Sequence, residues 1–107
     1  MRSTDLAGAV LRASNLVGAD LAYANLTLAN LRGANLRDAQ LKGATLQKAD
    51  LVNADLTNAD LTYADLTAAT LEGAVLNGTK LDHAIWAEGV VCMPGSIGQC
   101  KLARPAP

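Results

Sequence analysis

The sequence predicts an all-β solenoid, in which one short unit is stacked many times, and three regularities carry this prediction. Leucine stands at every fifth position from Leu6 to Leu81, and Trp86 takes the next place in the series. Alanine usually stands two residues before each leucine, with Asp or Asn often between them. Glycine often occupies the second position after leucine. A register this strict over most of the 107 residues is typical of a repeat protein.

A period of five fits neither a straight helix nor a flat strand. In an α-helix, leucines five residues apart step by about 140° and spread around the cylinder. In a flat strand, every second leucine would face the opposite side of the sheet. Both conflicts disappear if the chain turns a corner within each unit. Alanine and leucine then point inward along a short extended run, and the polar residue between them points outward.

The residue at the corner should govern the type of turn. Glycine, as at Gly33 and Gly43, suits a corner where φ becomes positive, as in a type II turn. At other corners a residue with a side chain replaces glycine, and there we expect a different turn type. These corners include Tyr23, Asp38, Lys48 and Tyr63.

The repeated segments resemble the pentapeptide-repeat proteins. Ala29-Asn30-Leu31-Arg32-Gly33 and Ala34-Asn35-Leu36-Arg37 carry this resemblance, which covers about residues 4–88. It implies a right-handed quadrilateral β-helix with four pentapeptides per coil and about four coils, in which residues twenty apart stack. The β-helix would then span 4–88, and 89–107 would form a C-terminal capping tail.

The predicted core is a ladder of inward leucines, closed at its end by a tryptophan. Alanines fill the space between them, because the chain has no Phe and only one Trp. The core residues that we predict are Leu21, Leu26, Leu31, Leu36, Leu41, Leu46, Leu51, Leu56, Leu61, Leu66, Leu71 and Trp86.

Composition and charge argue against several classes of partner. The formal net charge of −1 points to neither nucleic acid nor a polyanionic surface, so we expect no direct nucleic-acid binding. No apolar run approaches the roughly 20 residues that span a bilayer, so we expect no membrane insertion.

Outward charges recur with a fixed offset. Each of three basic residues precedes an acidic residue by eighteen positions. If residues twenty apart stack, the acidic residue lies one coil later and is displaced diagonally from the basic residue. The pairs are Arg32 with Asp50, Arg37 with Asp55, and Lys42 with Asp60. We interpret them as weak surface pairs of about 0.2–1 kcal/mol each. The alternative is a docking band for a charged partner.

One predicted column carries aromatic side chains. Tyr23, Gly43, Tyr63 and His83 are each twenty residues from the next. Tyr23, Tyr63 and His83 are therefore candidates for an interaction surface, the alternative being a decorated corner. His83 is the sole histidine, and the acidic residues pair with no nucleophile. We expect no catalytic residue, no metal site and no cofactor.

The tail leaves the repeat and holds both cysteines. Cys92 and Cys100 are separated by seven residues rich in Gly, Pro and Ser. This spacing is too wide for a redox Cys-x-x-Cys motif and lacks further zinc ligands. A disulfide would imply an oxidising compartment, whereas two free thiols would be ordinary in the cytosol. We predict a disulfide between the two cysteines that closes a short loop in the tail. The tail also resembles C-terminal segments of cyanobacterial and plant-lumenal pentapeptide-repeat proteins, which favours a lumenal or periplasmic location.

The two ends of the solenoid need cover, since a terminal coil exposes unpaired backbone groups and core leucines. Trp86, Val90, Val91 and Ile97 supply an apolar cap at the C-terminal end. Since few residues precede the first repeat, we expect either that this chain is part of a longer multidomain protein or that its N-terminal end packs on a partner, including a second copy.

Two classes of function remain for a rod of this kind. The first is a non-catalytic structural or protein-interaction module whose partner is unknown. The second is a DNA mimic that inhibits or protects DNA gyrase, as the family resemblance allows. A DNA mimic of this family would need a longer, strongly acidic rod, often with Phe at the central position of the repeat. The near-neutral charge and the absence of Phe favour the interaction module.

Overall fold

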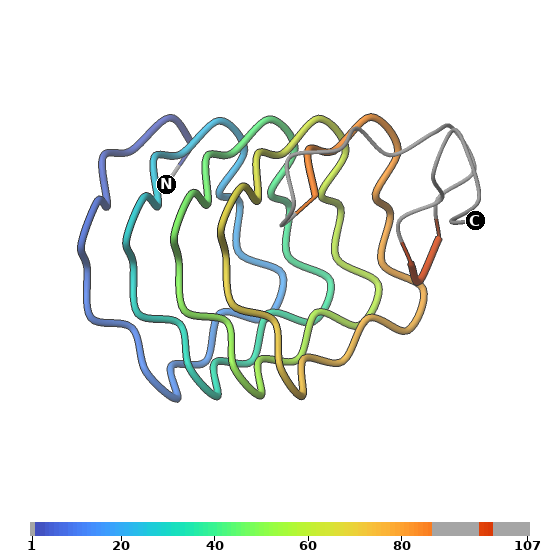
Figure 1. Cartoon of the computed structure of the whole chain (residues 1–107), viewed down its shortest axis with the longest axis horizontal. Coiled ribbons are helices and arrows are strands. Elements are labelled where there is room, and N and C mark those ends of the chain that lie inside the picture. The colour runs from blue at the N-terminus through green and yellow to red at the C-terminus, as the bar shows by residue number, and fades with distance from the viewer. Residues whose placement is uncertain (1, 87–96, 100–107) are drawn as a thin grey trace.

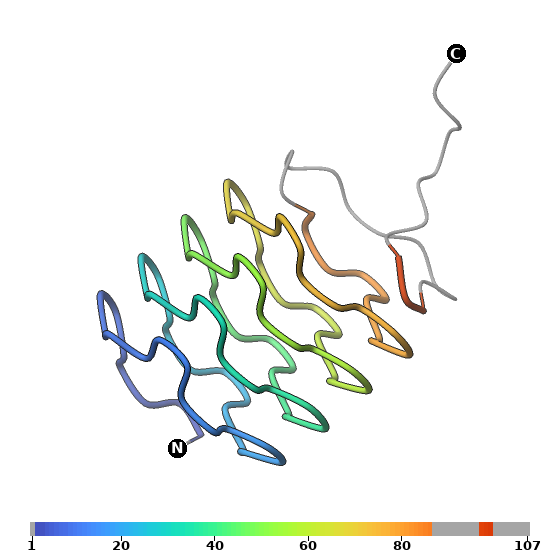
Figure 2. The same cartoon turned by 90° about the horizontal axis from the view of Figure 1, so that it is seen from below.

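The computed structural model describes residues 2–86 and 97–99. Within these residues the chain forms no helix, and its β-structure consists of isolated bridges. Between Asp5 and Ile85 every bridge is parallel and joins residues that are twenty positions apart. The steps from Asp5 to Asn25, Thr45, Asp65 and Ile85 form one such ladder. Successive coils therefore lie side by side along the long axis of the molecule (Figures 1 and 2).

Three backbone N–H groups per unit donate to neighbouring coils, those of the bridge residue, the leucine and the corner residue. The N–H of Leu26 donates to the carbonyl of Thr45 at 2.7 Å, one coil later. The N–H of Asn25 donates to the carbonyl of Thr4 at 2.9 Å, one coil earlier. The same two offsets recur along the chain, so each inner coil is hydrogen-bonded to the coil before it and to the coil after it.

Each corner is a β-turn closed by a short hydrogen bond. The alanine N–H donates back to the carbonyl of the leucine three residues earlier, as from Ala24 to Leu21 at 3.0 Å. The third residue of the turn has a positive φ while the second does not, which is the type II pattern. Gly33 has a φ of 69° and Tyr63 has a φ of 62°.

The prediction that corners without glycine adopt another turn type is wrong. Positive φ values near 60° occur at Tyr23, Asp38, Lys48 and Tyr63 as well as at the glycines. The reason is the stacking register. The N–H of Tyr23 donates to the carbonyl of Lys42 at 2.9 Å, just as the N–H of Gly33 donates to Val52. A different turn would break this bond, so the stack holds L-residues in a conformation that costs about 1–2 kcal/mol each.

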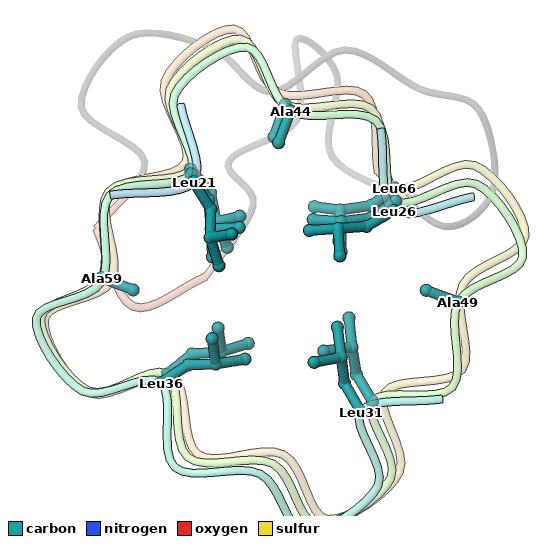
Figure 3. Packing of buried hydrophobic residues seen from close by; sticks show 14 of the residues in the cluster. Leu21, Leu26, Leu31, Leu36, Ala44, Ala49, Ala59 and Leu66 are labelled. Carbon is teal, nitrogen blue, oxygen red and sulfur yellow. The ribbon is translucent and has the colours of Figure 1, made fainter. Parts of the chain in front are cut away.

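The core lies inside the coils and consists of leucine and alanine. Leu21, Leu26, Leu31 and Leu36 point inward from four successive sides, with alanines between them (Figure 3). Leucines of the middle coils are 0–1% exposed, and this set comprises Leu21, Leu26, Leu31, Leu36, Leu41, Leu46, Leu51, Leu56, Leu61 and Leu66. Leu71 and Trp86 are partly buried and pack against the same cluster.

The first coil is less covered than those above it. Leu6, Leu11 and Leu16 are only partly buried, although they pack against the core cluster. The N–H groups of the bridge residues Asp5 and Val10 make no backbone hydrogen bond within the described residues. This end therefore presents a strand edge beside half-covered leucines.

The last described coil contacts a segment that lies outside the repeat. Ile97 forms an antiparallel bridge with Lys80, and the N–H of Gly98 donates to the carbonyl of Thr79 at 2.8 Å. Thr79 stands where most units have alanine and is fully buried. Its Oγ1 donates to the carbonyl of Leu56 at 2.7 Å, so the buried hydroxyl is satisfied.

The described part of the chain contains no helix that is long and apolar enough to span a membrane.

Candidate interaction surface

Where Asp or Asn precedes a leucine, its side chain supports the turn that follows. Its Oδ1 accepts a hydrogen bond from the backbone N–H two residues later, as from Arg32 to Asn30 at 3.2 Å. The acceptors of this kind are Asp5, Asn15, Asp20, Asn25, Asn30, Asn35, Asp50, Asp55, Asp60 and Asp65. This is the Asx-turn arrangement, which explains why the position prefers these two residue types.

Threonine strengthens this arrangement in three successive units. The hydroxyls of Thr57, Thr62 and Thr67 each donate to the Oδ1 of the aspartate two residues earlier. This role was missing from the sequence prediction, although the triplet Asp-Leu-Thr recurs at 55–57, 60–62 and 65–67. The repetition of that triplet was the signal that would have revealed it.

The predicted diagonal charge pairs form in part. Arg32 Nε lies 3.1 Å from Asp50 Oδ2, and Arg37 Nε lies 3.5 Å from Asp55 Oδ2. Lys42 does not reach Asp60, since no ion pair joins them within the described residues. The same offset also occurs at Arg2, whose Nε lies 3.2 Å from Asp20 Oδ2. All three arginine side chains are more than half exposed, so these pairs are weak surface pairs.

Hydrogen bonds to the carboxylates stabilise their charged form. The hydroxyl and then the N–H of Thr57 lower the pKa of Asp55, with a smaller contribution from Arg37. The N–H of Ala22 lowers the pKa of Asp20, assisted by Arg2. Partial burial opposes ionisation of Asp65, but Thr67 and Gln47 outweigh it and the pKa of Asp65 is lowered too. None of the three is therefore poised to exchange a proton near neutral pH.

Tyr23, Gly43, Tyr63 and His83 form a single column, which we call the aromatic corner column. The rings of Tyr63 and His83 are stacked, with centroids 4.8 Å apart and planes 14° from parallel. The Tyr23 ring leans over Gly43, where a Cβ would lie 2.5 Å from both Cδ1 and Cε1 of Tyr23. Tyr23 and Tyr63 remain 54% and 59% exposed. The structure thus brings the three predicted surface residues together.

The side of the coil that follows this column carries acidic and uncharged residues at its outward positions. Its outward positions in the described coils are Asp5, Ala7, Asn25, Thr27, Thr45, Gln47, Asp65, Thr67 and Ile85. Asp65 Oδ2 accepts a hydrogen bond from Gln47 Nε2 at 2.6 Å. No Lys or Arg stands at any of these positions. We call this side the cation-free side.

The described residues show no candidate metal site. In residues 2–86 and 97–99, no three His, Cys, Asp or Glu side chains gather as metal ligands would. Cys92, Cys100, Val90 and Val91 lie outside the described residues, so the predicted disulfide and most of the apolar cap are not placed.

The chain belongs to the pentapeptide-repeat family. A family model described as pentapeptide repeats matches eight copies, over residues 1–33, 34–73 and 59–85. No curated protein matches the chain. Membership in this family implies a right-handed β-helix, in agreement with the parallel register of twenty residues.

Solved structures of the same family are similar to this chain. A pentapeptide repeat protein from Nostoc PCC 7120 shares 46% identity over 73% of this chain and 64% of its own, with a TM-score of 0.72. Rfr23 from the cyanobacterium Cyanothece 51142 shares 40% identity over 75% of this chain and 54% of its own, with a TM-score of 0.74. This chain thus spans less than two thirds of either protein.

A more distant similarity concerns the fold alone. QnrB1, a plasmid-mediated fluoroquinolone resistance protein, shares 18% identity over 77% of this chain and 47% of its own, with a TM-score of 0.50.

Proposed function

We propose that this chain is a non-catalytic protein-interaction module that presents rigid solenoid faces to a protein partner. The observation that carries the proposal is the uniform ladder of bridges twenty residues apart. It holds outward side chains on a fixed grid, with coils spaced by about 4.8 Å. A preorganised surface of this kind loses little conformational entropy on binding, which favours association.

The state of the polar groups supports a role without catalysis. Aspartates that could act as acids or bases accept hydrogen bonds within the turns, as Asp55 and Asp60 do from Thr57 and Thr62. His83 stacks on Tyr63. These side chains serve the scaffold, since the threonine hydroxyls that meet aspartate carboxylates do so within the turns.

Affinity capture with matched surface variants tests this proposal. The wild-type protein is immobilised and exposed to an extract of the source organism, beside variants that carry an outward charge, such as Thr27→Lys on the cation-free side or Val17→Lys on another side. We expect a discrete partner to be retained by the wild type and lost with substitutions on one side only. Uniform retention or loss across all sides, at unchanged thermal stability, would contradict a specific interaction face.

The DNA-mimic alternative has less support. The carboxylates of Asp50 and Asp55 face Arg32 and Arg37, which neutralises part of the acidic surface. A mimic of duplex DNA needs about one negative charge per 1.7 Å of length. We therefore expect purified protein to leave supercoiling by DNA gyrase unchanged even in large molar excess. Potent inhibition that weakens with salt would favour the mimic instead.

We also propose that residues 89–107 cap the β-helix that spans 4–88. The support is the pairing of Ile97 and Gly98 with Lys80 and Thr79. A Cys92–Cys100 disulfide would close a loop in this tail and stabilise it by about 2–3 kcal/mol. A lumenal or periplasmic location rests on that bond.

The mass of the intact protein tests the disulfide. Protein isolated without reductant should resist alkylation and gain two alkyl groups only after reduction. Reduction should also change the fluorescence of Trp86, which borders the tail, while the inner coils stay folded. If both thiols are alkylated in native protein without reduction, the disulfide is absent and the argument for a lumenal or periplasmic location fails.

We propose a second contact at the N-terminal end of the rod, where the first coil is only half covered. Its strand edge and the leucines Leu6, Leu11 and Leu16 would be covered by further residues of a longer multidomain protein or by a second copy of the chain. Sedimentation at increasing concentration separates the two: self-association through this end predicts a dimer that Val10→Lys weakens.

A further inference from the structure

One outward column of the rod ends in opposite charges. It consists of Arg12, Arg32, Val52 and Glu72, each twenty residues from the next. Arg32 pairs with Asp50. Arg12 and Glu72 are exposed, and neither side chain has a partner among the described residues. Three coils of about 4.8 Å separate these two residues by about 14 Å, so their side chains do not meet within one chain.

A second outward column runs beside the first and carries exposed apolar groups. It consists of the corner residues Gly8, Leu28, Lys48 and Ala68, and the bridges that join Val10, Asn30, Asp50 and Thr70 lie between the two columns. Leu28 is 60% exposed and Val10 is 77% exposed. The face made by residues 8–12, 28–32, 48–52 and 68–72 thus combines apolar surface with charges of both signs. We call it the mixed-charge face.

The mixed-charge face is complementary to itself when a second copy runs antiparallel to the first. A two-fold axis would pass between the levels of Arg32 and Val52, so each column would face itself in reverse order. Arg12 would meet the partner's Glu72, and Glu72 would meet the partner's Arg12. The contact would contain two such ion pairs, and no charge on this face would oppose a charge of its own sign.

The middle of this contact would be apolar. Leu28 would face the alkyl stem of the partner's Lys48, whose ammonium group can stay in water. Val52 would face the stem of the partner's Arg32, while the guanidinium of that arginine keeps its own Asp50, as at 3.1 Å within one chain. Burial of Leu28 and Val52 would therefore add to the charge pairs at the two ends.

One other outward column of the described coils ends in opposite charges, but both of its ends are engaged. Asp20 Oδ2 lies 3.2 Å from Arg2 Nε, and the backbone of Lys80 forms a bridge with Ile97. Opposite charges without partners at both ends therefore distinguish the mixed-charge face.

We propose that the mixed-charge face binds a second, antiparallel copy of this chain in a two-fold symmetric dimer. Four coils make a face only about 19 Å tall, so the buried area is small and the dimer should be weak and sensitive to salt. The inference goes beyond the proposed function, because its occupant is a second copy of the chain. It also differs from self-association through the N-terminal end, since Glu72 lies three coils from Arg12.

Charge reversal tests the pairing by sedimentation of the whole chain at concentrations up to about millimolar. The wild type should form a dimer that dissociates as salt is added. Arg12→Glu alone and Glu72→Arg alone should each weaken dimerisation at least about tenfold, because each homodimer would contain two contacts between like charges. An equimolar mixture of the two variants should dimerise again, since both end contacts of the mixed dimer join opposite charges.

Lys42→Glu is the matched control for charge reversal. Lys42 is exposed, forms no ion pair among the described residues and lies two sides away from the mixed-charge face. Its reversal should leave dimerisation unchanged. Glutamate and arginine both occur naturally in the column of Arg12 and Glu72, so the two test variants should fold. In the wild type, the amide NMR signals of Val10 and Thr70 should shift as the concentration rises, whereas that of Lys42 should not.

A wild type that stays monomeric at millimolar concentration would overturn this inference. So would a mixture that associates no better than either variant alone, or an equal loss with Lys42→Glu. A dimer that Arg12→Glu weakens and Glu72→Arg does not would place the contact at the N-terminal end of the rod instead. If the dimer fails while affinity capture still retains a partner through one side, the interaction module stands and this dimer falls.

Discussion

The guanidinium of Arg32 meets the carboxylate of Asp50 from one coil below, with Nε and Oδ2 at 3.1 Å. The offset of eighteen residues is a property of the solenoid, because twenty residues make one coil and the long arginine side chain covers the remaining diagonal. Lys42 and Asp60 have the same offset without forming the pair.

These two pairs predict a difference in coupling energy. A double-mutant cycle of Arg32→Ala and Asp50→Asn should give a coupling of about 0.2–1 kcal/mol in the free energy of unfolding, falling as salt is added. The matched cycle of Lys42→Ala and Asp60→Asn should give a coupling near zero. Urea denaturation of the single and double variants measures both, and equal couplings would show that the geometry does not decide the energy.

Removing one central leucine should be costly. Leu51 is 1% exposed within a rigid ladder, so Leu51→Ala should reduce the free energy of unfolding by about 2–5 kcal/mol through the cavity it leaves. Thr70 is exposed at a bridge position, and Thr70→Ala should change stability by less than about 0.5 kcal/mol. Chemical denaturation compares the two, and similar losses would contradict the assignment of inward and outward positions.

Two corner glycines should respond differently to alanine. Both have φ near 70°, but a Cβ at Gly33 would meet no atom within 4 Å, whereas one at Gly43 would meet the Tyr23 ring. Gly33→Ala should cost about 1 kcal/mol from backbone strain alone. Gly43→Ala should cost more, and the excess should vanish when Tyr23 is also alanine. An excess that persists in the double variant would mean that Tyr23 is not its source.

Acid should weaken the fold through its turn aspartates. The pKa values of Asp20, Asp55 and Asp65 lie below the ordinary 3.8, so their stabilisation is complete above about pH 5. It is lost as the pH falls through 3.8 toward the lowered values of the folded state. Denaturation at a series of pH values should show this decline. Asp55→Asn should flatten it, since asparagine can accept the same turn bonds without titrating; an unchanged slope would exclude Asp55.

The leucine period was sufficient to predict a corner in each unit, because only a corner lets leucines five apart share one interior. The stacking of residues twenty apart was predicted from the resemblance to the pentapeptide-repeat family. The turn conformation at Tyr23 and Lys48 was not predictable from local preference. Local preference assigns positive φ to glycine, whereas the hydrogen bonds between coils impose it on every corner residue. The packing of Tyr23 over Gly43 also depends on contacts between coils, which the spacing of twenty could locate but not orient.

The antiparallel approach of Ile97 to Lys80 has a consequence for assembly. Every other bridge in the described coils is parallel, so a neighbouring molecule that extended the rod would have to add its coil in the parallel sense. On this side the N–H of Gly98 already occupies the carbonyl of Thr79. On this side of the last coil, the antiparallel pairing thus occupies a backbone carbonyl that a parallel coil of a second molecule would need.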